Sequence, residues 1–241
     1  MAQLKFLKRV GYSDINTRQD DDSAFFYSAG MQIDADGGYH AYHPDGVSGM
    51  DYLANAGKPG NWWGLATDNG KPSGNPVIQK KSDPAPGFYV STTSLEDEEM
   101  PSTDPRRYVD AESINFFVLP GKLGLGAKLG DFGVVVRPDR NDYDYAVFAD
   151  TGPAGQIGEA SVALAAALNI PSNPKHGGTS GGIIYIVFAG SKKSWPLTQV
   201  EIDHNASALF AEWGGLDMAK ECFPDAHWVQ GAPEIKIAVT V

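Results

Sequence analysis

The hydrophobic positions along this chain form short runs, and glycine and proline residues separate them throughout the sequence. Several of these runs are rich in β-branched and aromatic residues, which strands prefer, and the frequent glycine and proline favour turns. The pattern therefore predicts many short strands in one body. The expected strands cover residues 31–33, 39–42, 88–92, 116–119, 133–137, 145–149, 183–188 and 235–241.

Two segments show a helical pattern instead. Residues 159–168 include a run of alanine and leucine, which are good helix formers, and Asn169 and Pro171 follow it. A second helix is expected over residues 204–213, because Gly214 and Gly215 follow directly and glycine commonly ends helices. The acidic run at residues 96–99 precedes two prolines and is interpreted as a solvated loop.

The overall charge narrows the classes of partner. The formal net charge is −11, so nucleic acids and anionic membrane surfaces would be repelled and a cationic or neutral partner is favoured. The alternative is that the acidity serves solubility alone. No apolar run is long enough for a membrane span, and no signal-peptide core follows the first ten residues. We expect a cytosolic protein, a mature form without its leader, or export by a route that needs no leader.

Several kinds of site are excluded. A single cysteine, Cys222, allows no internal disulfide and no thiolate zinc site. No phosphate-binding loop or nucleophile elbow occurs, and the histidines lack the spacing of a zinc pair. The Asp34 segment starts like a calcium loop, but Tyr39 stands where that loop requires glycine. We therefore expect no metal and no cofactor.

One segment places two carboxylates at a spacing that suits catalysis. The strand expected at 145–149 would deliver Asp150 to its end, Gly152 and Pro153 would turn the chain, and Glu159 would open the next helix. Hydrolysis of a glycosidic bond needs two such groups facing one cleft. The alternative is structural: Asp150 would cap the turn, and Glu159 would complement the helix dipole. The residues alone leave both interpretations open.

Two further clusters suggest a binding surface for sugars. In the first cluster, residues 33–45, strand alternation would put Asp34 and Asp36 on one face, with Tyr42 and His43 at the exit of the strand. The adjacent tryptophans cannot both be buried in one direction, so one of them should face solvent or a groove. Aromatic faces attract ammonium groups, and together with the acidic charge this set points to a polymer that carries amines. The tryptophans are Trp62 and Trp63.

An ordered series of short motifs over about residues 30–215 resembles glycoside hydrolase family 75, the fungal and bacterial chitosanases. The series is far more specific than any one of its pieces. It consists of IDADG at 33–37, AYH at 41–43, GMDYLANAG at 49–57, WWG at 62–64, PGFYVS at 86–91, VDA at 109–111, VLP at 118–120, LGD at 129–131, the segment 150–161 and IYIVFAGS at 184–191.

The resemblance implies an endo-acting glycoside hydrolase that cleaves β-1,4 links in chitosan with inversion. The family's essential pair falls on Asp150 and Glu159, and we expect Glu159 as the acid and Asp150 as the base. Relatives are typically secreted, whereas no leader is visible here. Alternatives are a hydrolase of another amino-sugar polymer, such as peptidoglycan, and a non-catalytic carbohydrate-binding protein of the same fold.

The remaining expectations follow from this interpretation. Asp34 and Asp36 would bind glucosamine ammonium groups or hold the water, and Tyr42, His43, Trp62 and Trp63 would contact the substrate. The partner would be a cationic polysaccharide, bound by a monomer. The expected fold class is mainly β (α+β), a single barrel-like domain over residues 1–241 with a few helices, and the suggested topology is a double-psi β-barrel.

Overall fold

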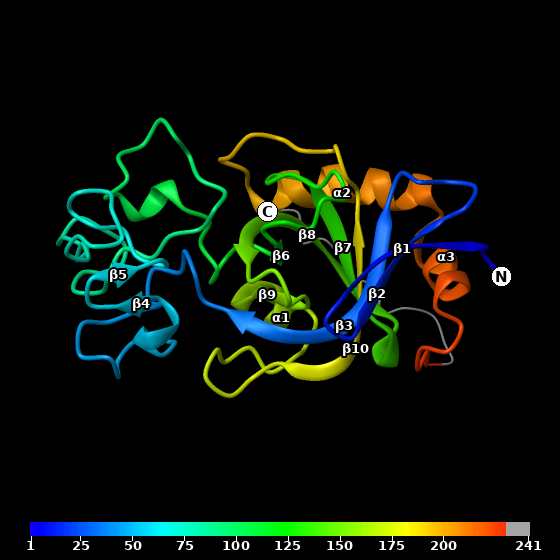
Figure 1. Ribbon diagram of the computed structural model, residues 1–241, viewed down its shortest axis with the longest axis horizontal. Helices are drawn as coiled ribbons and strands as arrows, with labels where there is room; N and C mark the ends of the chain where they lie inside the picture. Colours follow the sequence, from blue (N-terminus) through cyan, green and yellow to red (C-terminus); the bar gives the residue numbers. More distant parts are fainter. Residues whose placement is uncertain (230–241) are drawn as a thin grey trace.

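A closed barrel of six strands forms the centre of the molecule (Figure 1). The structure, a computed structural model, describes residues 1–229. The strands follow the order β3-β10-β7-β8-β6-β9, and pairing of β9 with β3 closes the barrel. The predicted mainly β, barrel-like fold is confirmed, and its double-psi topology stays a prediction. The strands are β3 (Phe25–Asp34), β6 (Phe116–Pro120), β7 (Phe132–Arg137), β8 (Asp142–Gly152), β9 (Glu159–Ser161) and β10 (Thr179–Val187).

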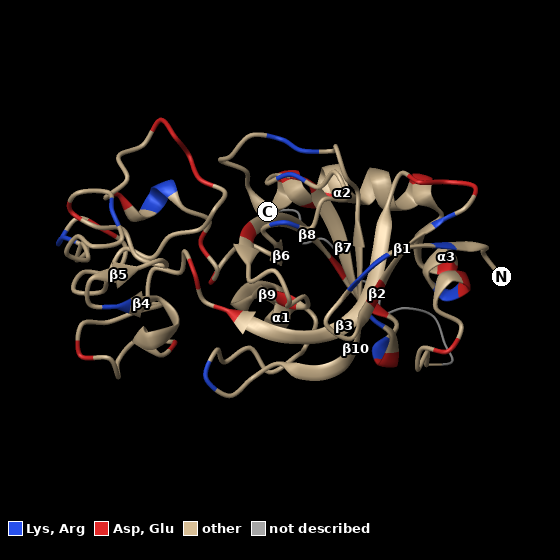
Figure 2. Ribbon diagram, viewed as in Figure 1, with Lys and Arg blue, Asp and Glu red and all other residues tan. Residues whose placement is uncertain are grey.

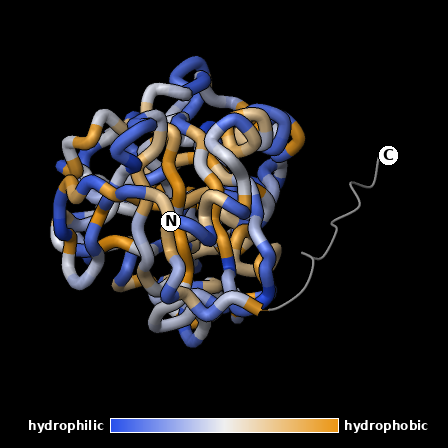
Figure 3. The backbone as a smooth tube through the Cα atoms, turned by 90° about the vertical axis from the view of Figure 1, so that its right-hand side faces the viewer, coloured by the Kyte–Doolittle hydropathy of each residue, from blue (hydrophilic) through white to orange (hydrophobic). Residues whose placement is uncertain are grey.

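Alternate residues of these strands fill the barrel interior. Phe117, Phe148 and Tyr185 belong to one buried hydrophobic cluster, and the ring of Tyr27 stacks on that of Tyr185 with 4.9 Å between the ring centroids. The residues between them face outward and form separate clusters with the helices. Figure 3 shows the hydrophobic segments running through the middle of the body. Burial of both strand faces explains why these segments read as continuous apolar runs.

A hairpin that the sequence did not predict extends the sheet beyond β3. Strands β1 (Leu4–Val10) and β2 (Ser13–Arg18) pair antiparallel, and β2 pairs with β3. Charged residues interrupt the apolar positions of β1, which is largely exposed, so its alternation is weak in the sequence. Gly11 and Tyr12 form the tip of this hairpin.

In the described part of the chain, three α-helices cover the barrel. Helix α1 (Val162–Ala167) buries Leu164 and Ala165 in the same cluster as the interior strand residues. Helix α2 (Gln199–Trp213) lies against the outer faces of β7 and β8. It begins at a capping box of Thr198 and Glu201 and ends at Gly214, whose φ is 113°. Helix α3 (Gly215–Cys222) follows it directly.

Residues 35–111 form a region of loops beside the barrel, which we call the loop lobe (Figure 1). Its regular elements are short: the 3-10 helices η1 (Leu53–Asn55) and η2 (Pro105–Arg107), and the strand pair β4 (Gly57–Lys58) and β5 (Asn61–Trp62). Two small hydrophobic clusters, one around Tyr42 and Trp62 and one around Val90 and Tyr108, hold it together. The one further short helix of the described chain, η3 (Pro138–Arg140), joins β7 to β8.

The structure corrects several predicted elements. Residues 39–42 form turns rather than a strand, because Gly37 and Gly38 bend the chain and the Ala41 amide bonds back to Gly38. Residues 88–92 make only isolated bridges, since their amides bond to separate segments of the lobe. The predicted helix at 159–168 begins three residues later, and α2 begins five residues earlier than predicted. The strand predicted at 235–241 lies outside the described residues.

Candidate active site

The sheet register places Asp150 and Glu159 on either side of one residue. Val118 of β6 pairs with Asp150 of β8 and also with Glu159 of β9. Neighbouring strands lie about 4.8 Å apart, so the two carboxylate-bearing backbones are separated by roughly 10 Å. Residues directly opposite each other point to the same face of a sheet. The side chains of Asp150 and Glu159 therefore point to the same face of the sheet as the side chain of Val118.

A bulge in β8 sets the direction of Asp150. Phe117 pairs with Phe148, but the next residue, Val118, pairs with Asp150, so Ala149 is an extra residue in β8. Plain alternation would point Asp150 to the barrel interior with Phe148. The extra residue turns it outward, as β-bulges do. Asp150 was predicted at a strand end, whereas β8 continues beyond it to Gly152.

Asp150 is anchored to the loop lobe through Ser94. The amide of Ser94 donates to Asp150 Oδ1 at 2.9 Å, the Ser94 hydroxyl donates to the same oxygen, and the Thr151 amide donates at 2.8 Å. Burial raises the pKa of Asp150, while these hydrogen bonds oppose the rise because they stabilise the ionised form. The same hydrogen bonds fix the orientation of the Asp150 carboxyl group.

Glu159 begins a strand and not a helix. The N-cap of α1 is Ser161, whose buried hydroxyl accepts from the Leu164 amide, so the dipole of α1 does not act on Glu159 directly. Gly158, which precedes Glu159, has φ of 96° and lies close to Ala29. A Cβ atom added to Gly158 would come within 2.7 Å of the Ala29 Cβ atom. Burial raises the pKa of Glu159 to about 7, and the charges of Asp150 and Asp51 add to the rise.

Asp34 and Asp36 lie where β3 passes into the loop lobe. Asp34 is the last residue of β3 and accepts from the Asp36 amide at 2.7 Å. Asp36 lies beyond the strand, so the prediction that both acids share one strand face is wrong. Burial raises the pKa of both groups well above the usual range. The charges of Asp36, Asp150 and Glu159 add to the rise at Asp34, and those of Asp150, Glu159 and Asp51 add to it at Asp36.

Tyr42 orients the acids of the lobe. Its hydroxyl donates to Asp36 at 2.7 Å and lies 3.5 Å from Asp51 Oδ2. Asp51 is buried and accepts from Asn55 Nδ2 at 2.8 Å. Asp51 lies in one of the motifs that carry the family resemblance, but no pattern in the sequence marks it as a site residue. No alternation marks it, because the segment around it is irregular.

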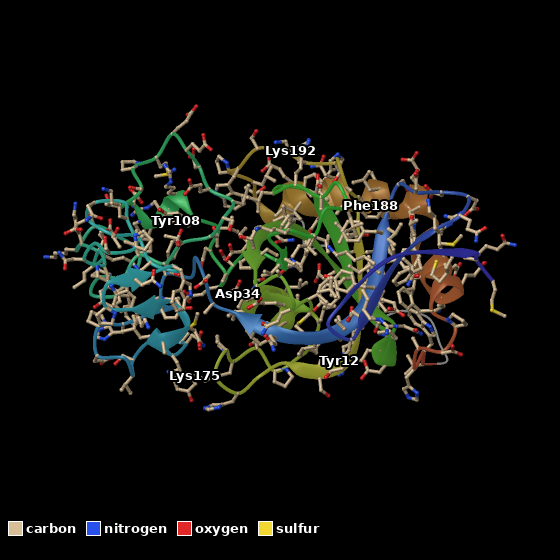
Figure 4. All side chains as sticks on the ribbon, in the orientation of Figure 1. Tyr12, Asp34, Tyr108, Lys175, Phe188 and Lys192 are labelled. Carbon is tan, nitrogen blue, oxygen red and sulfur yellow. The ribbon has the colours of Figure 1, made fainter. Side chains whose placement is uncertain are left out.

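A cavity of about 610 Å³ is lined by four of these carboxyl groups, and Asp150 is not among the described residues that line it. Asp34, Asp36, Asp51 and Glu159 line it, and residues 174 and 177–180 form another part of its wall. Among residues 1–229, no lysine or arginine lines it. Figure 2 shows acidic segments at the tip of β3 and in the chain that leaves it, and Figure 4 places Asp34 between the barrel and the lobe. Within residues 1–229, no group of three His, Cys, Asp or Glu side chains is arranged to hold a metal ion.

The predicted aromatic contacts divide between two places. Trp62 is buried in the lobe and Trp63 is 58 % exposed, which confirms that one tryptophan faces outward. Both line a separate cavity of about 490 Å³ that also includes Ser94, the partner of Asp150. His43 lies 2.9 Å from Asp45 and packs edge-on against Phe88, and it does not line the acidic cavity.

Comparison with known proteins gives one family. Residues 108–213 match the family model described as fungal chitosanase of glycosyl hydrolase group 75. The family resemblance is confirmed. The group 75 match covers the chain from β6 to the end of α2 and therefore includes both Asp150 and Glu159. It indicates a glycoside hydrolase of a family that acts on a polysaccharide.

The curated proteins contain no match to this chain. Among the residues that the structure describes, no helix is long and apolar enough to cross a membrane.

Proposed function

We propose that this protein is an endo-acting chitosanase that hydrolyses β-1,4 links with inversion, using Asp150 and Glu159 as its catalytic pair. The observation that carries the proposal is the register at Val118, which both residues flank. Inversion requires carboxyl groups about 6.5–9.5 Å apart, so that a water molecule fits between substrate and base. Backbones separated by two strand spacings, roughly 10 Å, suit that requirement.

The environments of the two groups support distinct roles. Glu159, with a pKa raised to about 7, holds a proton near neutral pH and can donate it to the departing oxygen. Asp150 accepts hydrogen bonds from Ser94 and Thr151, which favour its ionised form and suit a base that activates water. The negative charge of Asp150 also helps to keep the proton on Glu159.

The cavity suits a cationic sugar polymer. Burial raises the pKa of Asp34 and Asp36, and an ammonium group of glucosamine would oppose that rise because it stabilises their ionised forms. The attraction between the two charges is stronger where water is excluded. We assign this role to Asp34, Asp36 and Asp51, and we assign stacking of a sugar ring to the exposed Trp63. The barrel and the loop lobe both contribute to this one cavity, so we treat residues 1–241 as one catalytic domain. An extracellular site of action is proposed from the family alone.

The direct test is hydrolysis of chitosan, chitin and peptidoglycan side by side. Reducing ends measure cleavage, a fall in viscosity measures endo action, and early NMR spectra show the anomer of the product. We expect cleavage of chitosan with an α-anomeric first product. Cleavage of peptidoglycan alone, binding without cleavage, or a β-anomeric first product would each contradict the proposal.

A further inference from the structure

A loop of the barrel reaches the loop lobe beside the acidic cavity. Residues 171–178 lie between α1 and β10 in the chain and extend toward the lobe (Figure 1). Three residues of this loop, at 174, 177 and 178, line the acidic cavity, and so do Asp51 and Asn55 of the lobe. The cavity therefore lies between the barrel and the lobe, with loop 171–178 as one of its walls.

Lys175 joins this loop to the lobe. Its Nζ donates to the carbonyl oxygens of Gly49 at 2.7 Å and of Val47 at 3.1 Å, and it lies 5.3 Å from the centroid of the Tyr52 ring. Carbonyl oxygens and an aromatic face are favourable partners for an ammonium group. Among the described residues, these are the only hydrogen bonds between loop 171–178 and the lobe. Figure 4 places Lys175 where the loop faces the lobe.

The backbone of the loop is fixed on the barrel. The Gly177 amide donates to the Asn173 carbonyl oxygen at 2.6 Å, and the Gly178 amide donates to the Pro171 carbonyl oxygen at 2.7 Å. Gly178 has φ of 86°, and a Cβ atom there would clash with the Met31 carbonyl oxygen of β3. The part of this contact that can move on the barrel side is therefore the lysine side chain.

The other contacts of the lobe with the barrel are firmer. The Leu95 amide donates to the Ala149 carbonyl oxygen at 2.8 Å, and the Ser94 amide donates to Asp150. The chain itself passes from β3 into the lobe after Asp34. A contact made by one long side chain at the surface opens at a lower free energy than buried backbone hydrogen bonds do. The lobe can therefore part from loop 171–178 while its other contacts remain.

We propose that Lys175 is a latch: its contact with the lobe holds the acidic cavity closed around a bound polymer and opens to let the middle of a chain enter. The inference rests on the proposed function, because an endo-acting enzyme takes up its polymer away from the ends. A permanent tie between the two walls would obstruct sideways entry of a long chain, whereas a short oligosaccharide can enter lengthwise. The closed latch keeps the lobe carboxyl groups near the substrate.

A reversible lock tests the opening. Val47→Cys and Lys175→Cys together place thiols on the two sides of the latch, and the native cysteine, Cys222, is buried. A bifunctional methanethiosulfonate about as long as a lysine side chain joins the thiols, and dithiothreitol releases them. We expect the locked protein to lose about tenfold or more in kcat/KM on polymeric chitosan and less than about threefold on a glucosamine hexamer.

Both activities should return on reduction, and each single-cysteine variant treated with the same reagent is the control. No loss on the polymer, or an equal loss on the polymer and the hexamer, would overturn the latch.

Removing the latch should weaken binding without slowing the chemistry. Lys175→Met should raise KM for polymeric chitosan about fivefold and change kcat less than about twofold, because strand register holds Asp150 and Glu159. Lys175→Arg keeps a cation and should remain near the wild type. Lys58→Met, at an exposed lysine of the lobe that does not line the acidic cavity, is the matched control. A tenfold fall in kcat, or an equal effect of Lys58→Met, would contradict the proposal.

Hydrogen exchange separates the latch from the proposed function, because it needs no substrate. The amides of Met50 and Asp51 donate to the carbonyl oxygens of His40 and Ala41 beside the latch, and they should exchange about fivefold faster in Lys175→Met. Unchanged exchange would overturn the latch even if chitosan is cleaved. Faster exchange in the variant, with no cleavage of chitosan by the wild type, would overturn the proposed function alone.

Discussion

The barrel and the loop lobe hold the acidic residues of the candidate site by different means. In the barrel, paired strands fix each backbone position, so Asp150 and Glu159 are placed by register against Val118. In the lobe, few strands exist, and Asp36 and Asp51 are placed by hydrogen bonds from Tyr42 and Asn55. A ladder of backbone hydrogen bonds holds its residues more rigidly than single side-chain contacts do.

This difference matches a division of labour. Acid–base catalysis depends on small distances between reacting groups, which rigid strands provide. Binding of ammonium groups along a polymer tolerates more movement, because charge attraction falls off slowly with distance. We therefore expect barrel variants to act mainly on kcat and lobe variants mainly on KM.

The largest effect is expected from the barrel pair. Asp150→Asn and Glu159→Gln should each lower kcat on chitosan by about 10²–10⁴-fold, because each removes one partner of general acid–base catalysis. Steady-state kinetics measure the loss, and circular dichroism confirms that the variants fold. A folded variant that retains more than about a tenth of wild-type kcat would remove that residue from the pair.

In the lobe, Asp36→Asn should act on binding. Loss of a charged partner for an ammonium group should raise KM for chitosan about tenfold or more, with kcat reduced less than about threefold. Glu99→Gln, an exposed acid of the same lobe, serves as the control and should change neither value. A fall in kcat as large as that of the barrel variants would end the proposed division.

The charge of Glu159 should also cost stability. A carboxyl whose pKa is raised to about 7 on folding binds its proton more tightly in the folded state, so stability falls as pH rises from about 4.5 to about 7. Glu159→Gln should therefore increase the free energy of unfolding at pH 8 by about 1–3 kcal/mol and leave it nearly unchanged at pH 4. Thermal unfolding at the two pH values measures this difference, with Glu99→Gln again as control. An equal gain at both values would attribute it to packing instead of charge.

The sequence predicts the barrel better than the lobe for a physical reason. Strands β6 and β7 and residues 183–187 of β10 are buried on both faces, so their residues are almost all apolar and mark them clearly. The chain of the lobe bonds to itself over irregular paths, and its aromatic segments at 39–42 and 88–92 resemble strands without pairing as strands. Local composition does not distinguish a paired strand from such an unpaired aromatic segment.

The candidate site shows the same limit. Asp150 and Glu159 are found from their spacing and from the family resemblance, but the residues alone allow structural roles for both. The bulge at Ala149, which turns Asp150 outward, depends on pairing with a strand about thirty residues away and leaves no local pattern. Asp51 reaches the cavity only through the fold of the lobe.

The smallest effect, and the sharpest test of contact between the two regions, concerns Asp51. The charge of Asp51 in the lobe helps to raise the pKa of Glu159 in the barrel. Removing that charge in Asp51→Asn makes the Glu159 proton easier to lose. If Glu159 is the acid, the alkaline limb of kcat/KM should therefore move to lower pH, by roughly half a unit.

The acidic limb provides the internal control. It reports the base, and the hydrogen bonds of Ser94 and Thr151 that act on the pKa of Asp150 remain in Asp51→Asn, so this limb should move less than the alkaline limb. The pH profiles of the wild type and of Asp51→Asn are measured on the same soluble chitosan oligosaccharide. The titration of the substrate's own amines then affects both profiles equally. A shift of the acidic limb alone would exchange the roles of the pair, with Asp150 as the acid, because the group that responds to Asp51 would then be the base. An alkaline limb that moves upward would contradict the contact itself, since loss of a negative neighbour can only lower the pKa of a carboxyl group.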